Sequence, residues 1–190
     1  MRIIVRYFQF NICVLLLFSF CLVGCSDNEK SRTGEVPDIK EEQVPEYSLM
    51  EVKHYHYKDG LLRLEITFEE GEYYSDTEEL NIDNCTYIYY DINETIVSKG
   101  RSRKAKVFDN QSLIIAEKDV VIISEVNGAV LETDYLEWHG KEEQFVTERP
   151  VTITRQNGDM ISGIGMIADI TLRYITIKKG VTGSFSDTQK

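Results

Sequence analysis

Histidine and carboxylate side chains are the residues of this chain that could do chemistry, and their spacing argues against an active site. His54 and His56 lie two apart on an expected strand, so they point the same way. A metal site needs at least a third ligand, and His139 is distant in sequence. We therefore interpret the histidines as surface residues. Glu69-Glu70 and Glu142-Glu143 are adjacent pairs, which we interpret as solvated loop charges rather than an acid/base couple.

Catalytic sequence motifs are also missing. The sequence contains no Gly-x-Ser-x-Gly elbow, phosphate-binding loop, His-Glu-x-x-His or Cys-x-x-Cys. Ser162-Gly163-Ile164-Gly165 falls short of a dinucleotide fingerprint, and no helix is expected after it. We therefore predict that the chain is not an enzyme, and we expect no cofactor and no metal.

Cys25 is the cysteine with the clearest chemical prediction. Arg2 and Arg6 provide a basic start, an uncharged apolar segment follows, and Gly24 precedes Cys25 where the polar chain begins. This arrangement is typical of a bacterial lipoprotein signal, which is cut before a cysteine that then receives lipid. The alternative is an uncleaved membrane helix over residues 3–23, because a span needs about 20 apolar residues. Both interpretations place the following domain outside the cytoplasm.

Charge and the remaining cysteine limit the partners and the means of stabilisation. The formal net charge is −11, and removal of Arg2 and Arg6 would make it more negative. Such an acidic surface argues against nucleic acid as a partner, since that binding relies on Lys and Arg. It also argues against a broad basic patch on anionic lipid headgroups. With Cys25 acylated, Cys85 is left alone, so no intramolecular disulfide is expected and the domain must rely on its core.

The composition divides the chain into four expected segments. These are a signal peptide at 1–24, a lipidated flexible tether at 25–46, one β-domain at 47–180 and a C-terminal tail at 181–190. The tether is rich in charged residues and Ser, and it has too few apolar residues to form a core.

Short strands and turns dominate from Tyr47 onward. Leu62, Leu64, Ile66 and Phe68 alternate with polar residues, which predicts a strand with one buried face. Further strands are expected at 85–90, 113–116, 120–124 and 171–178, and Pro150 is expected to open another. Turns are predicted at Asp59-Gly60, Asn127-Gly128 and Asn157-Gly158. Residues 121–128 and 151–158 echo each other as a strand with an Asn-Gly turn, which suggests stacked hairpins.

An all-β chain of this kind allows two interiors. A jellyroll or open barrel whose walls do not close would enclose an apolar groove suited to acyl chains. A plain sandwich with a packed core has the same alternating pattern, and composition alone favours that second arrangement.

A motif series between residues 119 and 165 favours the jellyroll with an open interior over the packed sandwich. It comprises Val-x-Ile and Gly-x-x-Leu-x-Thr-Asp-x-Leu-x-Trp at 121–138, Thr-Glu-x-Pro-Val-x-Ile-x-Arg-x-x-Gly at 147–158, and Gly-x-Gly at 163–165. In order and spacing this series resembles the LptC family of periplasmic lipopolysaccharide-export proteins. The resemblance extends over residues 47–180 and is specific in the second half. Two features depart from the family pattern. One is Asp119, and the other is the predicted lipid anchor, which stands in place of a membrane helix.

The resemblance implies a twisted antiparallel β-jellyroll with an open apolar interior. It also implies a membrane-anchored periplasmic protein that accepts lipopolysaccharide, or a related glycolipid, from an inner-membrane ABC transporter. Such a protein passes the lipid to a periplasmic jellyroll bridge protein by edge-strand pairing, while the partner hydrolyses ATP. The alternative is a structural or binding lipoprotein on the inner face of the outer membrane, with a closed core and no lipid cargo.

Two groups of site residues follow from these expectations. The pleat decides which residues share a face but not which face is inside, so the more apolar face is taken as the lipid-binding interior. That interior is expected to contain Leu62, Leu64, Ile66, Phe68, Val121, Ile123, Leu136, Trp138, Val151 and Ile153. The partner-binding edge is expected to contain Gly163, Ile170, Leu172, Tyr174, Ile175 and Ile177.

Overall fold

The computed structural model describes residues 44–186. Over this range the chain forms nine strands and one short 3-10 helix, η1 (Asp109–Gln111). The strands are β1 (Tyr47–Lys58), β2 (Leu61–Tyr74), β3 (Glu79–Tyr90), β4 (Ile96–Phe108), β5 (Leu113–Ser124), β6 (Val130–His139), β7 (Gln144–Thr154), β8 (Met160–Asp169) and β9 (Ile175–Ser184). The all-β prediction is confirmed.

All nine strands belong to one sheet whose spatial order equals the chain order, each strand antiparallel to the next. Local turn chemistry explains this simple topology. Between β1 and β2, Asp59 and Gly60 have φ values of 54° and 78°, as a two-residue hairpin turn requires. The two predicted Asn-Gly turns join β5 to β6 and β7 to β8, so these three turn predictions are confirmed.

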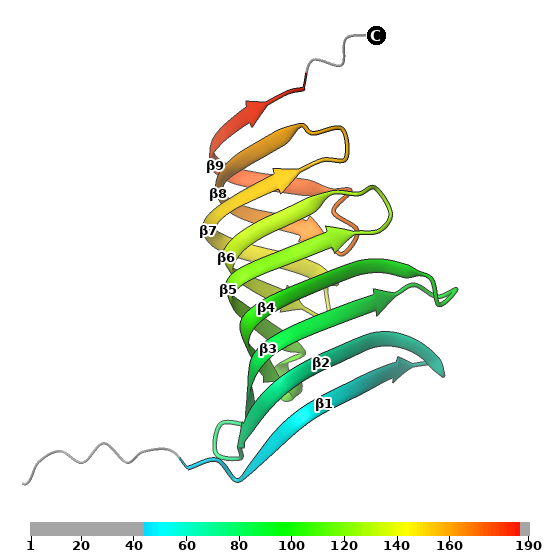
Figure 1. The fold of residues 1–190 in the computed structure, drawn as a ribbon, viewed down its shortest axis with the longest axis vertical. Coiled ribbons are helices and arrows are strands. Elements are labelled where there is room, and N and C mark those ends of the chain that lie inside the picture. Colours follow the sequence, from blue (N-terminus) through cyan, green and yellow to red (C-terminus); the bar gives the residue numbers. More distant parts are fainter. Residues whose placement is uncertain (1–43, 187–190) are drawn as a thin grey trace, which may run out of the picture. The chain divides into compact units, whose positions relative to one another are not determined.

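A line of irregularities in mid-strand folds this sheet on itself. The register shifts within the β4–β5, β5–β6, β6–β7, β7–β8 and β8–β9 pairings. Lys118 and Asp119 in β5 have positive φ, as has Gly165 in β8. Such bulges bend a strand and increase its twist. The strands therefore curve, and one half of the sheet lies in front of the other (Figure 1).

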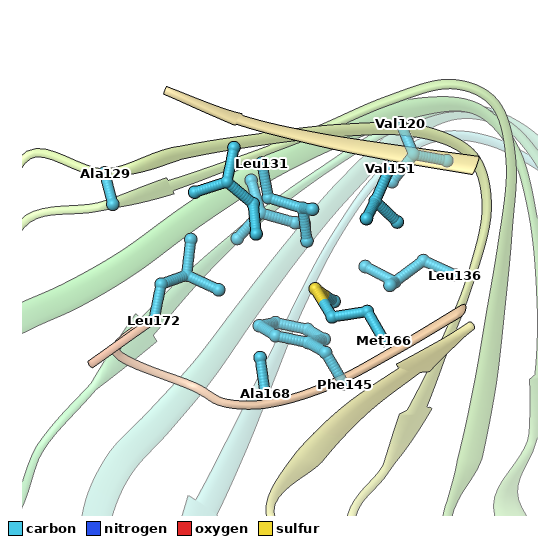
Figure 2. Close-up of a cluster of buried hydrophobic side chains, with 11 residues drawn as sticks. Val120, Ala129, Leu131, Leu136, Phe145, Val151, Met166, Ala168 and Leu172 are labelled. Carbon is cyan, nitrogen blue, oxygen red and sulfur yellow. The ribbon is translucent and has the colours of Figure 1, made fainter. Parts of the chain in front are cut away.

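The two halves of the folded sheet form two walls. The space between these walls is filled by two hydrophobic clusters. The N-terminal cluster has the buried residues Ile66, Phe68, Ile82 and Ala105. The C-terminal cluster, drawn in Figure 2, has Val120, Ile122, Ala129, Leu131, Leu136, Phe145, Val151, Ile153, Met166, Ala168 and Leu172. Between residues 44 and 186 no buried side-chain nitrogen or oxygen lacks a hydrogen-bond partner.

Three structural details differ from the sequence predictions. Glu69 and Glu70 lie in β2 rather than in a loop, although both are exposed. Pro150 lies inside β7, next to its register shift, where no ladder N–H is needed. The last strand starts at Ile175 and continues to Ser184, so residues 181–184 of the predicted tail belong to β9.

The predicted signal peptide, Cys25 and nearly all of the predicted tether lie outside the described residues. Within the described part of the chain, no helix is long and apolar enough to cross a membrane.

Candidate binding cavity

An apolar cavity of about 60 Å³ lies where the two clusters meet. It is lined by side chains from β2 to β7 and by one residue of the β8–β9 turn, namely Leu64, Ile66, Cys85, Tyr87, Tyr89, Arg101, Ser102, Ala105, Ile114, Ala116, Val120, Ile122, Leu136, Trp138, Phe145 and Ile170. Arg101 is the one charged residue among them. The cavity is therefore suited to hydrocarbon rather than to a polar ligand.

Four aromatic rings connect the two walls beside this cavity. The Trp138 ring is centred 5.0 Å from that of Phe145 and 5.9 Å from that of Tyr89. Tyr87 lies 6.5 Å from Phe145, and its hydroxyl shares a 2.8 Å hydrogen bond with Ser98 Oγ. Burial raises the pKa of the Tyr87 hydroxyl above its usual value. These rings make the wall of the cavity apolar and determine its shape.

A polar rim lies at the outer end of this aromatic group. The Arg63 guanidinium donates to the Tyr89 hydroxyl at 2.9 Å and to the Tyr90 carbonyl at 3.0 Å. The Tyr89 hydroxyl in turn donates to Glu143 Oε1 at 3.4 Å. Because Tyr89 belongs to β3 and Glu143 to the β6–β7 turn, this chain of contacts joins the two walls.

Seven of the ten predicted interior residues face the space between the walls. Leu64, Ile66, Leu136 and Trp138 line the cavity itself. Phe68 belongs to the N-terminal cluster and Val151 and Ile153 to the C-terminal one. Leu62 is half-buried but belongs to neither cluster, and it lies beside the register shift of the β1–β2 pairing, which interrupts the alternation of β2. A role of these residues in lipid binding stays a prediction.

Val121 and Ile123 were placed on the wrong face of β5. Ile123 is 39% exposed, whereas Val120 and Ile122 are 1% and 2% exposed. Residues 120–123 are all apolar and β-branched, so alternation could not decide which pair points inward.

Sequence reasoning also missed Tyr87, Tyr89 and Phe145 as cavity residues. The first two share a face with Cys85, at a spacing of two within the segment 85–90 that was predicted as a strand. That period-two pattern was the signal that could have identified them.

The predicted partner-binding edge is only partly an edge. Ile175 and Ile177 lie on β9, which within the described part of the chain has β8 as its single neighbour. Ile170, Leu172 and Tyr174 lie in the β8–β9 turn instead, and Leu172 is buried. The strand stops because Asp169 accepts hydrogen bonds from the Thr171 and Tyr174 backbone N–H groups, which folds the chain into a turn.

Gly163 lies in β8, between β7 and β9, and therefore not at an edge. The expected close backbone approach is present but involves the protein's own last strand. A Cβ atom on Gly163 would lie 2.4 Å from Ile177 Cγ2 and 2.9 Å from the Lys179 carbonyl oxygen. The glycine therefore allows β9 to dock.

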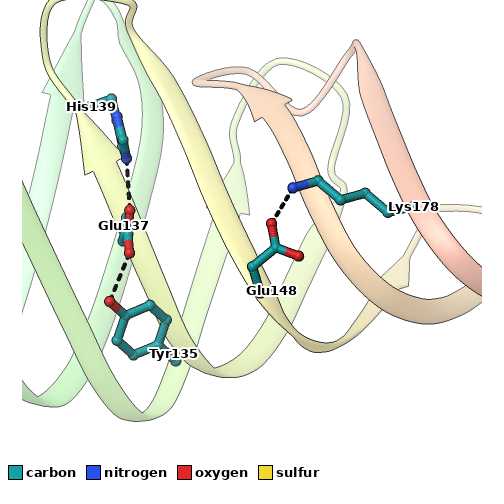
Figure 3. A network of polar contacts seen from close by, with 5 residues as sticks. All are labelled: Tyr135, Glu137, His139, Glu148 and Lys178. Atoms are coloured by element: carbon teal, nitrogen blue, oxygen red, sulfur yellow. Dashed lines mark hydrogen bonds and ion pairs between the residues drawn. The ribbon is translucent and has the colours of Figure 1, made fainter.

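The outer surface carries polar contacts without a catalytic arrangement (Figure 3). Tyr135 donates to Glu137 at 2.7 Å, and Glu137 contacts His139 Nε2 at 2.8 Å, all along β6. Burial and the hydrogen bond to Glu137 raise the pKa of Tyr135 to about 12. Lys178 pairs with Glu148 across β8. Residues 44–186 hold no group of three or more His, Cys, Asp or Glu side chains that could bind a metal.

Comparisons with known proteins agree with this geometry. The family model described as "Lipopolysaccharide-assembly, LptC-related" matches residues 13–186. No curated protein matches the chain. Among solved structures, the chain resembles LptH of Pseudomonas aeruginosa, described as the LptA homologous periplasmic component of the conserved lipopolysaccharide transport device. The TM-score is 0.53 at 5% identity, over 65% of this chain and 94% of LptH, which supports the jellyroll fold.

The family match extends over most of the sequence and includes the whole folded sheet. The chain therefore belongs to the LptC-related family of lipopolysaccharide assembly and is a periplasmic transport component rather than an enzyme.

Proposed function

We propose that the space between the two walls carries the acyl chains of lipopolysaccharide, accepted from an inner-membrane ABC transporter and passed to a periplasmic jellyroll bridge protein. The observation that carries this proposal is the apolar cavity at the junction of the two clusters, with Arg101 as its one charged lining residue. Acyl chains need apolar contact and no hydrogen bonds, and this lining offers that.

The size of the cavity requires the walls to separate when lipid binds. At about 60 Å³ the cavity is well below the roughly 300–1,000 Å³ of typical ligand sites. Among residues 44–186 the sheet is not closed, since β1 pairs only with β2 and β9 only with β8. An unclosed sheet can widen without breaking a backbone ladder.

The same two edges are suited to the transfer partners. An unpaired strand edge offers its N–H and C=O groups to a strand of another protein. We assign β1 to the supplying complex and β9, with Ile175 and Ile177, to the receiving jellyroll. Cys25 would provide the lipid anchor that holds the domain at the inner membrane.

Adjacent isoleucines on β5 provide a matched test of the lipid path. Ile114 lines the cavity, whereas Ile115 points to the other face of the sheet, and both are half-buried. A photo-crosslinking amino acid at either position is activated in living cells, and the adduct is probed for lipopolysaccharide. We expect an ATP-dependent adduct at Ile114 and little at Ile115. Equal yields at both positions would contradict an interior path.

A second candidate is a structural lipoprotein of the outer membrane with a closed core. The observation in its favour is the C-terminal cluster, in which eleven side chains are buried. It predicts no adduct at Ile114, together with fractionation of the anchored protein with the outer membrane.

A further inference from the structure

The turn between β8 and β9, residues 170–174, is hydrogen-bonded to the opposite wall, and we name it the strap. If the sheet were laid flat, this turn and the β5–β6 turn would lie at opposite ends of the strands. Successive strands are antiparallel, so the turns alternate between the two ends, and the β8–β9 turn is three turns after the β5–β6 turn. The fold of the sheet brings these two ends together. Ser124 Oγ donates to the Thr171 carbonyl at 2.6 Å.

Asn127 is the second fastening of the strap. Its side-chain amide donates to the carbonyl oxygens of Thr171 at 3.3 Å and Leu172 at 3.2 Å. The fastening thus consists of side-chain donors from one turn and backbone acceptors of another, with no strand ladder between them. Such hydrogen bonds can be exchanged for water one at a time.

Leu172 is the strained element of the strap. It has φ of 51°, a left-handed conformation that a leucine rarely adopts. It is the one apolar member among the non-glycine residues with positive φ in residues 44–186. Its side chain is 2% exposed and points into the C-terminal cluster near Ala129 and Leu131 (Figure 2). Burial therefore holds a conformation that the isolated turn would leave.

The strap also forms part of the cavity wall through Ile170. We propose that the strap is a releasable closure over the C-terminal half of the interior, fastened by Ser124 and Asn127, and that its release extends the cavity towards β9. The identity of the occupant, an acyl chain, rests on the proposed function. A closure at this position would determine when lipid can move from the cavity to the last strands.

The internal echo of the sequence supplies a matched control. Asn127 and Asn157 occupy equivalent turns, and each accepts a backbone N–H two residues on, from Ala129 at 3.0 Å and Asp159 at 3.1 Å. The Asn157 amide donates only within its own turn, to Asp159. Asn127→Asp keeps the turn acceptor and removes the strap donor, whereas Asn157→Asp makes the same change away from the strap.

Trypsin measures release of the strap directly, because Arg173 is an exposed residue within it. In the full-length protein, Asn127→Asp should speed cleavage after Arg173 by about tenfold, as expected for the loss of one to two hydrogen bonds. Cleavage after Arg155, in the β7–β8 turn, is the internal reference and should not change. Asn157→Asp should leave cleavage after Arg173 at the wild-type rate. Ser124→Ala is the second variant and should act in the same direction as Asn127→Asp.

Fluorescence of Trp138, the single tryptophan of the chain, measures lipid access. The probe is a phospholipid with brominated acyl chains, which quenches tryptophan on contact. We expect quenching several-fold faster in Asn127→Asp than in wild type or Asn157→Asp. Unchanged cleavage after Arg173 overturns the strap, and so does faster cleavage when the lipid quenches Trp138 at the same measurable rate in all three proteins. Faster cleavage with no quenching in any protein supports the strap and contradicts the lipid path.

Discussion

The two clusters between the walls differ in how completely they exclude water. The C-terminal cluster has eleven buried residues and six half-buried neighbours, whereas the N-terminal one has four buried residues and eight half-buried neighbours. The strap covers the C-terminal cluster with Leu172. One folded sheet thus combines a firmly packed half with a looser half, and the cavity lies at their junction. The looser half is the better place for lipid to enter, since separating its walls disrupts fewer buried contacts.

The largest expected effect comes from equal truncations in the two halves. Leu131 is 0% exposed in the C-terminal cluster and Ile66 is 8% exposed in the N-terminal one. We expect Leu131→Ala to lower the free energy of unfolding by about 4 kcal/mol and Ile66→Ala by about 2 kcal/mol, because the looser site can collapse. Urea unfolding measures both. Equal losses would remove the proposed difference between the halves.

A second pair of variants tests which face of β5 belongs to the packed half. Ile122→Ala should cost about 3 kcal/mol and Ile123→Ala less than about 1 kcal/mol, because only the first removes a buried side chain. The same unfolding measurement applies. A larger loss for Ile123→Ala would restore the face that the sequence analysis had chosen.

Sequence alone was sufficient where a local rule has one outcome. Asp59, Gly60 and Gly128 provide the positive φ that their turns require, and alternation identified the inner face of β2. Sequence alone failed where alternation allows two apolar faces, or where the contact that determines the structure is distant in sequence. The run of four β-branched residues at 120–123 has two equally apolar faces. The segment after Asp169 alternates like a strand. Its turn depends on hydrogen bonds that the Asp169 carboxylate accepts and on Ser124, which is 47 residues from Thr171 in sequence.

A third test concerns how β9, the last strand of the packed half, docks on β8. Gly163→Ala should cost about 2 kcal/mol, because the new Cβ meets the Lys179 carbonyl, a backbone atom that cannot move freely. Gly183→Ala is the control, since its Cβ would meet the exposed ring of Phe185 at 3.2 Å and should cost less than about 1 kcal/mol. Hydrogen exchange of the β9 amides should accelerate in the first variant alone. Unaltered exchange in Gly163→Ala would show that β9 docks without this contact.

The smallest effect is a pH dependence in the looser half. Cys85 lines the cavity, and burial raises the pKa of its thiol to about 11. Since the thiolate is the reactive form, alkylation of the native protein should be slow at pH 7 and rise about tenfold per pH unit until the pH nears that pKa. Rates with a small maleimide between pH 7 and 9 measure this. A plateau near pH 8.5 would indicate a thiol in water.

The order of the sheet has a consequence for how proteins of this architecture change in length. Every strand pairs with its neighbours in sequence, and no connection crosses another. An additional hairpin inserted between two strands would therefore add two strands to the sheet. Every other strand pairing would stay in place, as in repeat proteins. The cross-section of the interior would stay constant while its length grew. The distance that such a protein spans is thus set by the number of its hairpins.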